Sequence, residues 1–389
     1  MKVLYISWDS CAREDIPEAL GDFGFGVEEY WIDARKNTLG DQKLKAEILR
    51  LIRRENFAFV FSWNFFPIVS EACGEAGMKY ASWVYDSPLR SLWHPEAGQP
   101  WNYIFIFDAE DYLELSQRLE TVYYLPLAAN AAQFDRYRQE EIPELYQVPV
   151  SFVGSTYMES RYSGYQNLQQ LEPYQKGYVE GMMKAQQMVY GTYVLEELME
   201  PALIEGLKQI HPMGISEEEH YQYEKHMAQV VLARYITALE RKDILSLLSE
   251  KYPVYLYTKK KTLWLPRIIN RGRAGSRKES CFIFSSSKIN LNMTLRSIRT
   301  GIPLRALEIM AAGGFLLTNY QSEFLQYFEP DVDFVYYESY EDLLKKVDYY
   351  LSHEEERAQI AQSGYEKVKA YHSYANRFEV ILQTMGIRS

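Results

Sequence analysis

The chain has 389 residues, of which 47% are hydrophobic and 24% are charged, a composition typical of folded globular proteins. At about 150 residues per domain, this length predicts two domains. The formal net charge of -11 opposes the attraction on which non-specific nucleic-acid binding depends, so we expect no nucleic-acid partner. Three cysteines without CxxC spacing indicate neither a disulfide framework nor a thiolate metal site. No signal-peptide pattern and no apolar run of about 18 residues occurs, so we expect a cytoplasmic protein without a transmembrane segment.

In the N-terminal part, short apolar runs alternate with stretches of helical spacing. The predicted strands are residues 2–7, 57–62, 79–85, 103–107 and 122–125. Residues 41–56 carry a helical stripe of leucine and isoleucine, and Asp41 can cap its start. This alternation predicts a doubly wound parallel sheet, which binds ligands beyond the carboxyl ends of its strands. The polar residues expected near that edge are Asp9, Asn64, Asp86 and Asp108.

A second alternating series begins at residue 150. Its predicted strands are residues 150–153, 253–258, 281–284, 314–318 and 333–337. Pro143 and Pro149 indicate a linker and place the domain boundary near residue 149. Residues 157–251 lack a strand pattern and predict a helical insertion in the second domain, in which Ser216 and Glu219 form a capping box. The pattern after residue 340 is almost wholly helical.

One candidate site lies at the start of the second series. The strand over residues 150–153 runs into Gly154, Ser155 and Thr156, and Arg161 follows one or two helical turns later. Glycine and hydroxyl residues at a helix start can bring backbone N–H groups close to a phosphate. An ordinary tight turn would use glycine in the same way.

A second candidate site surrounds a predicted helix. Asn292 and Arg296 come before it, Pro303 suits its first turn, and Gly313 follows it. Arg305 and Glu308 are three residues apart and therefore project from one side of the helix near its N-terminal end. They could pair with each other, or they could face a ligand. The position of this helix after a loop that leaves the second sheet favours the ligand.

The first half offers a carboxylate for acid-base chemistry. Asp86 follows a buried strand and could accept a proton from an attacking hydroxyl, or it could form a turn before Pro88. Asp9 has the same kind of position. Elsewhere, the basic segment from Lys259 to Lys278 could receive an anionic donor or acceptor, or it could be a solvated loop.

Other reaction classes lose their main signals. The six histidines include no HExxH motif, so the sequence predicts no metal site. The chain also lacks the GxxxxGK[ST], GxGxxG and GxSxG patterns. These absences argue against a P-loop ATPase, a kinase, a simple dehydrogenase and a serine hydrolase.

The second half resembles a known family in three stretches: Val150-Ser-Phe-Val-Gly-Ser, Pro303 through Thr318, and Tyr340 through Leu351, with Gly364 and Arg377 closing the pattern. It is similar to the CgeB/YkvP-like glycosyltransferases, a bacterial group related to spore-maturation proteins and having a group 1-like C-terminal domain. The first half is loosely similar to the domains of unknown function that accompany them. The resemblance implies a GT-B fold, in which two Rossmann-like domains face a cleft. The acceptor-side domain would be residues 1–149 and the nucleotide-sugar domain residues 150–371, with a last helix at 372–389 packing back on the first domain.

The resemblance also implies residue roles. Glu308 would bind the ribose hydroxyls of the donor, Arg305 and the Gly154-Ser155 turn would face its diphosphate, and Gly313 would allow close packing beneath. We add Arg161, Asn292 and Arg296 as donor-binding candidates, and Asp86, followed by Asp9, as catalytic candidates. Many retaining relatives have a second Glu eight positions before the ribose-binding one, where this chain has Thr300. Retaining and inverting stereochemistry therefore both stay open.

We therefore predict an enzyme that transfers a sugar from a nucleotide-diphosphate-sugar to a hydroxyl of a glycan, protein or small-molecule acceptor. UDP or dTDP is the expected nucleotide, and we expect neither a metal nor another cofactor. One alternative is a nucleotide-sugar-binding protein without turnover, which the Thr at position 300 favours. The other is a nucleotide-sugar epimerase of the same two-domain shape, which would require a cluster of acid and base residues.

Overall fold

The computed structural model describes residues 1–10, 12–34, 39–158, 166–214 and 221–387. The chain forms two compact units. The first comprises Met1–Ala128, a short segment that ends at Tyr221, and His372–Ser389, and the second comprises Ala129–Gly214 and Gln222–Tyr371. Within the described ranges, no helix has the length and apolar character needed to cross a lipid bilayer.

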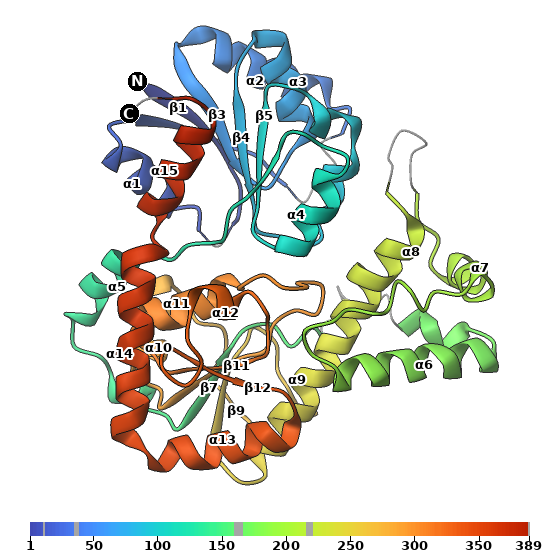
Figure 1. The fold of residues 1–389 in the computed structure, drawn as a ribbon, viewed down its shortest axis with the longest axis vertical. Helices are drawn as coiled ribbons and strands as arrows, with labels where there is room; N and C mark the ends of the chain where they lie inside the picture. The colour runs from blue at the N-terminus through green and yellow to red at the C-terminus, as the bar shows by residue number, and fades with distance from the viewer. Residues whose placement is uncertain (11, 35–38, 159–165, 215–220, 388–389) are drawn as a thin grey trace. The chain divides into compact units, whose positions relative to one another are not determined.

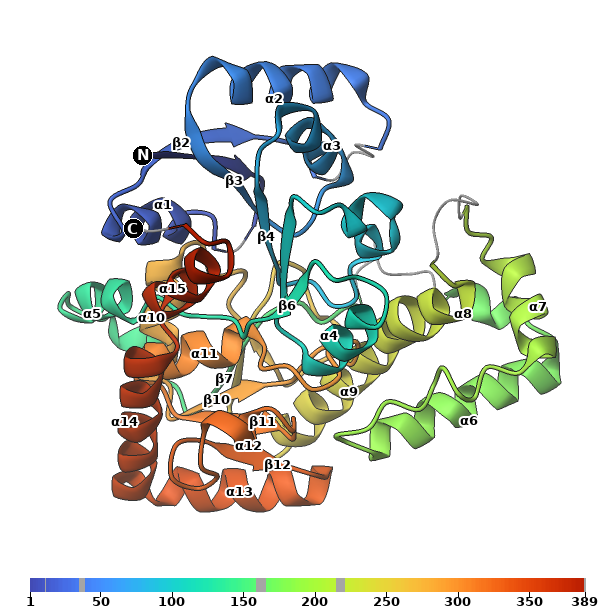
Figure 2. The ribbon, with the colours of Figure 1, turned by 45° about the horizontal axis from the view of Figure 1, so that its top comes forward.

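The first unit is built on a parallel sheet of six strands in the order β2-β1-β3-β4-β5-β6. Helices α1 and α15 lie on one face of this sheet and α2 and α3 on the other (Figures 1 and 2). The elements are β1 (Lys2–Ser7), α1 (Asp15–Asp22), β2 (Gly26–Trp31), α2 (Gln42–Arg54), β3 (Phe57–Trp63), α3 (Pro67–Ala76), β4 (Tyr80–Val84), β5 (Asn102–Ile106), α4 (Ala109–Ser116), β6 (Val122–Tyr124) and α15 (Tyr374–Thr384).

Two elements of this unit contrast in how clearly the sequence marks them. Helix α2 was predicted, and Asp41 caps it by accepting a hydrogen bond from the Leu44 N–H at 3.0 Å. Strand β2 was missed. It is an edge strand with no buried residue, so it lacks the apolar run that marks the central strands.

Helix α15 completes the apolar core of the first unit although it comes from the end of the chain. Phe378 is fully buried, with its ring 5.3 Å from that of Phe61. The Tyr374 ring lies 6.4 Å from Trp63 and 6.0 Å from Trp83. Residues after 371 therefore contribute to the apolar area that stabilises this unit.

The second unit has another parallel sheet of six strands, in the order β12-β11-β10-β7-β8-β9. Its strands are β7 (Val150–Val153), β8 (Val254–Tyr257), β9 (Ile269–Asn270), β10 (Ile289–Asn292), β11 (Leu316–Asn319) and β12 (Val335–Tyr337). Its helices are α5 (Ala131–Arg138), α6 (Pro173–Met188), α7 (Pro201–Ile210), α8 (Tyr223–Lys225), α9 (Ala233–Ser249), α10 (Arg277–Ser286), α11 (Leu304–Ala311), α12 (Phe324–Tyr327), α13 (Tyr340–Ser352) and α14 (Glu354–Tyr371). The two sheets confirm the predicted α/β fold of two doubly wound domains.

Between β7 and β8, the described chain is helical. Helix α9 packs on the sheet, and α6 and α7 lie further out (Figure 1). A π-helical turn over His226–Leu232 leads into α9. The predicted capping box at Ser216 and Glu219 falls outside the described residues.

Two expectations differ from the structure. Residues 281–284, predicted as a strand, lie inside α10, which begins where Ser276 accepts a hydrogen bond from the Glu279 N–H at 3.1 Å. A buried apolar run of four fits a helix as well as a strand, and here the capping residue decides. Helix α5 belongs to the second unit although it precedes residue 149, because it packs on α10, α11 and α14 of that unit, where Tyr365 of α14 donates to Asp135 at 2.8 Å.

Candidate functional site

The loop after β7 lies at the carboxyl edge of the second sheet, where doubly wound sheets bind ligands. The Gly154 N–H donates to the carbonyl of Tyr257 at the end of β8, at 3.0 Å. The Gly154 N–H group is therefore part of the hydrogen bonding between β7 and β8. A Cβ atom at residue 154 would lie 2.6 Å from Nη1 of Arg305. Gly154 thus leaves the space that a guanidinium group occupies.

Arg305 reaches this edge from the first turn of α11. Its guanidinium carbon lies 6.0 Å from the centre of the Phe152 ring. No described carboxylate forms an ion pair with it, so the predicted alternative of a pair with Glu308 is not formed. An arginine held against a sheet edge without an acidic partner is suited to bind a phosphate.

Glu308 pairs with another helix. Its Oε1 atom lies 3.5 Å from Nη2 of Arg277, the first residue of α10, and the two side chains are 18% and 15% exposed. The carboxylate is thus held by a cation while part of it stays accessible. The structure places Arg305 at the β7 loop and Glu308 towards α10, so the two share a helix but contact different groups.

Sequence reasoning missed Arg241, a buried residue of α9. It donates to the carbonyl of Ser155 at 2.6 Å and to the carbonyl of Met293. Its guanidinium group also lies over the rings of Phe152 and Tyr157. Burial, and to a lesser extent the positive charge of Arg305, lowers the pKa of Arg241 to about 10. Arg241 therefore ties the loops after β7 and β10 together, and only its contacts across the fold reveal that role.

Arg296, predicted to bind the donor, is buried and bonded within the protein. Its Nε and Nη2 atoms donate to the two carboxylate oxygens of Glu240 at 2.9 and 3.0 Å. It also donates to the carbonyls of Val189 and Gln187 at 2.8 and 3.2 Å. With its donors used in this way, Arg296 fastens the loop after β10 to the helical insertion, and its placement does not support a donor contact.

Asn292 and Gly313 also have structural explanations. The Asn292 side chain, buried at the end of β10, donates to the hydroxyls of Thr294 and Thr318 at 3.0 and 2.9 Å. Gly313 adopts φ 72° just after α11, and a Cβ atom there would lie 2.5 Å from Nη1 of Arg138. Gly313 stands at the end of α11 that leads into β11, so it does not lie beneath the Arg305 site.

Of the other predicted donor residues, Ser155 forms a local turn, in which its hydroxyl accepts from the Tyr157 N–H at 3.1 Å. Arg161 lies outside the described residues. Thr300 donates to the carboxylate of Glu323 at 2.7 Å, and both residues are buried. The loop that carries Thr300 is thereby pinned to the segment after β11.

In the first unit, Asp86 lies exposed after β4. The Asn64 side-chain amide donates to it at 2.7 Å, while the Asn64 carbonyl oxygen accepts from the Tyr85 N–H at 3.1 Å. Asn64 holds φ at 59°, a left-handed conformation that is unusual outside glycine. Both Asn64 and Asp86 stand at the carboxyl edge of the first sheet, so Asn64 fixes the direction of the carboxylate.

The same edge carries an aromatic surface. The rings of Trp8 and Tyr85 stack at 5.8 Å with an angle of 10° between their planes. Exposed Asp9 follows Trp8. Asp108, in contrast, is buried and caps α4 by accepting from the N–H groups of Glu110 and Asp111 at 3.0 and 3.2 Å. Asp108 is therefore a structural residue.

The second unit also has a cavity of about 750 Å³ at the opposite edge of its sheet. It is lined by residues that precede β7, β10 and β11, among them Pro149, Lys288 and Phe315. Ligands of doubly wound sheets bind at the other edge. The cavity is therefore separate from the Arg305 site. Among the described residues, no three His, Cys, Asp or Glu side chains gather so as to hold a metal ion.

Two doubly wound parallel-sheet units also make up the GT-B fold of glycosyltransferases, and the solved structures described below share this fold. Residues 241–383 match the model of a family described as glycosyl transferase-like. This segment contains α10, α11 and both Arg305 and Glu308. Residues 241–383 are thus similar to this glycosyl transferase-like family. No protein with a curated description matches the chain by sequence.

Solved structures share the fold at low sequence identity. HepE from Anabaena, in complex with UDP and glucose, has a TM-score of 0.55 at 10% identity, covering 99% of both chains. A glycosyltransferase from Rickettsia africae has a TM-score of 0.54 at 11% identity, covering 99% of this chain and 97% of the other. Sucrose-phosphate synthase from Thermosynechococcus elongatus has a TM-score of 0.51 at 11% identity, with the same coverage.

Proposed function

We propose that this protein is a glycosyltransferase of the CgeB-like group that moves a sugar from a nucleotide-diphosphate-sugar to an acceptor hydroxyl. The observation that carries the proposal is the Arg305 guanidinium group. It lies against Gly154 at the carboxyl edge of the second sheet, without an ion pair to any described residue. It also falls within the segment that matches the glycosyl transferase-like family.

In this proposal, the second unit binds the donor. Negative charge grows on the diphosphate as the bond to the sugar breaks, and Arg305 stabilises that charge. The Glu308 carboxylate, held by Arg277, accepts hydrogen bonds from the ribose hydroxyls. HepE was solved with UDP and with UDP-glucose, which supports a uridine diphosphate donor, with dTDP as the second choice.

We further propose that no metal and no other cofactor takes part, because a guanidinium group can supply the positive charge that the leaving diphosphate needs. Activity should then persist when a chelator such as EDTA is present. An activity that EDTA abolishes and Mg²⁺ restores would contradict this part of the proposal.

The first unit is proposed to activate the acceptor. Asp86 accepts the proton of the acceptor hydroxyl if the reaction inverts, and Asn64 orients it for that purpose. Asp9 is the second candidate. The acceptor is a hydroxyl of a glycan, a protein or a small molecule.

One observation favours the alternative of a nucleotide-sugar-binding protein without turnover. Thr300 stands where many retaining relatives have a Glu, and the carboxylate nearest to it, that of Glu323, is buried and hydrogen-bonded to Thr300. It therefore does not replace the missing contact to the sugar. A binding protein would bind UDP-sugars without hydrolysing or transferring them, and an epimerase would interconvert them.

The test is to incubate the full chain with a panel of UDP- and dTDP-sugars, while following sugar release and nucleotide affinity. We expect slow hydrolysis of at least one donor, and we expect Arg305→Met and Glu308→Ala to weaken donor binding about tenfold or more. Arg50→Met, which removes an exposed arginine of α2, serves as the matched control. Unchanged donor affinity in both site variants would contradict the proposal.

A further inference from the structure

The loop after β8 carries a basic cluster that the donor site does not use. Residues 259–273 contain six Lys or Arg and no Asp or Glu, in a chain whose formal net charge is -11. Lys259, Lys260, Lys261, Arg267 and Arg273 are exposed, and no described carboxylate pairs with them. The local positive charge therefore faces solvent without compensation.

An exposed apolar residue, Leu263, follows these lysines in the same loop. Leu263 is 87% exposed, the highest value of any large hydrophobic side chain in the described chain. Trp264 is partly buried against the core of the second unit, and Leu265 is part of that core. A leucine in water next to three lysines costs hydrophobic free energy unless another surface covers it.

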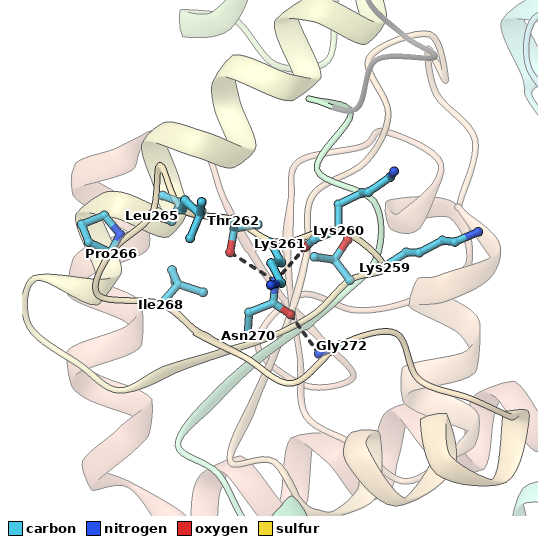
Figure 3. Close-up of a pocket in the computed structure, with 11 residues that line it drawn as sticks. Lys259, Lys260, Lys261, Thr262, Leu265, Pro266, Ile268, Asn270 and Gly272 are labelled. Carbon is cyan, nitrogen blue, oxygen red and sulfur yellow. Dashed lines mark hydrogen bonds between the residues drawn. The ribbon is translucent and has the colours of Figure 1, made fainter.

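The fold holds this loop in place. The Asn270 side-chain amide donates to the Lys260 carbonyl at 2.8 Å and to the Thr262 hydroxyl at 3.2 Å, and its oxygen accepts from the Gly272 N–H at 2.9 Å. Figure 3 shows Lys259 and Lys260 extending away from Asn270. The loop is thus pre-organised to present its charges outward.

Beneath the loop lies a cavity of about 530 Å³ (Figure 3). Its lining joins the three lysines to apolar Leu263, Leu265, Pro266 and Ile268. Lysines next to apolar side chains in one cavity suit a ligand that has an anionic group and an aliphatic chain.

We propose that residues 258–273 dock this protein on the surface of a lipid bilayer that contains anionic lipids. Clusters of Lys and Arg attract anionic headgroups, at about 1 kcal/mol for each residue near the surface. Leu263 enters the boundary between headgroups and acyl chains, while Trp264 lies at the level of the headgroups. Basic charge and an exposed apolar residue on one held loop fit a membrane surface better than a soluble anion, because a soluble anion would leave Leu263 in water.

The test measures flotation of the full chain with phosphatidylcholine vesicles, with and without phosphatidylglycerol. We expect binding only when the anionic lipid is present, and weaker binding as salt rises. The combined change of Lys259, Lys260 and Lys261 to Gln should weaken binding on the order of 100-fold. Leu263→Ser should weaken it about tenfold.

Matched controls come from the same unit. Met188→Ser removes another exposed apolar side chain, of 73% exposure, and Lys345→Gln removes a lysine that pairs with Glu341. Both should bind vesicles like the unchanged chain. Equal binding to neutral and anionic vesicles, or wild-type binding by either the triple lysine variant or Leu263→Ser, would overturn the proposal.

A soluble anion is the competing occupant of this loop. If the triple lysine variant lost affinity for UDP-sugars while its vesicle binding stayed the same, the loop would belong to the donor site and the docking proposal would be wrong. Vesicle binding without any reaction of nucleotide sugars would leave the docking intact and contradict only the proposed enzymatic function.

Discussion

The guanidinium group of Arg305 occupies the space that a side chain at residue 154 would need, since a Cβ atom on Gly154 would come within 2.6 Å of Nη1. The two residues belong to the loop after β7 and to the first turn of α11, which are far apart in the sequence but adjacent in the fold. The glycine therefore sets where the cation stands at the sheet edge.

Gly154→Ala should displace Arg305 and weaken UDP-sugar affinity about tenfold, the effect of a lost charge-assisted hydrogen bond. Gly154 has φ 158°, a backbone conformation that residues with a side chain rarely adopt, so the free energy of unfolding should also fall, by about 1–3 kcal/mol. Calorimetric titration and thermal denaturation measure the two quantities. Gly177→Ala, at a helical glycine with open space around it, is the control and should leave affinity unchanged. Donor affinity of the wild-type level in Gly154→Ala would argue against Arg305 as a phosphate ligand.

Glu240→Gln should destabilise the protein by about 3 kcal/mol, because it leaves the buried Arg296 charge without its counter-ion. Where the variant still folds, donor affinity should match that of the unchanged chain, since Arg296 is bonded to the helical insertion. Urea unfolding and nucleotide titration check both statements. Glu341→Gln, which breaks an exposed pair, should leave the free energy of unfolding almost unchanged. A loss of donor affinity without loss of folding in Glu240→Gln would indicate that Arg296 contributes to donor binding.

Asp86→Asn should abolish most sugar transfer or hydrolysis while donor affinity is retained, because the amide cannot accept the proton. Asn64→Gly keeps the left-handed backbone but removes the hydrogen bond to Asp86, so turnover should fall while affinity stays constant. In the Asp86→Asn background, Asn64→Gly should have no further effect on turnover. Independent, additive losses would show that Asn64 does not act through Asp86.

Stability should fall as the medium becomes acidic because of His372. Burial, and secondly the Arg377 guanidinium group, lowers the pKa of His372 to about 3, whereas the unfolded value is about 6.5. Between these values only the unfolded chain binds the proton, so in this range the free energy of unfolding should drop by about 1.4 kcal/mol for each pH unit.

His372→Asn keeps an acceptor for the Arg377 Nη2 atom, which lies 2.7 Å from the His372 Nδ1 atom, and removes the titrating group. Urea unfolding between about pH 7 and pH 5 should then show a smaller loss of stability than in the unchanged chain. An identical pH dependence in the two proteins would mean that other groups cause it.

The sequence predicted the central strands and the α/β class because buried parallel strands read as apolar runs that alternate with helical stripes. It missed β2, whose residues are exposed or half-buried at the sheet edge. It also assigned residues 281–284 to a strand, because a short buried run looks the same in α10. The hydrophobic pattern of the sequence therefore does not identify a strand or helix whose residues are all exposed or all buried.

The candidate site was only partly predictable. Gly154 was found because it follows an apolar strand, and Arg305 because it stands in the first turn of a helix that Pro303 marks. Arg241 could not be found, since its hydrogen bonds to Ser155 and Met293 join positions far apart in the chain. For the same reason Arg296 was assigned to the donor, as nothing in its neighbourhood of the sequence reveals Glu240. Long-range pairing decides whether an arginine binds a ligand or holds the fold.

Helix α15 gives the biosynthesis of this protein an unusual order. Residues 1–128 leave the ribosome first, yet Phe61, Trp63 and Trp83 lack the contacts with Tyr374 and Phe378 until these residues have been translated. Domains generally fold in the order of their synthesis. Here the aromatic core of the first unit is completed only after the second unit has been synthesised.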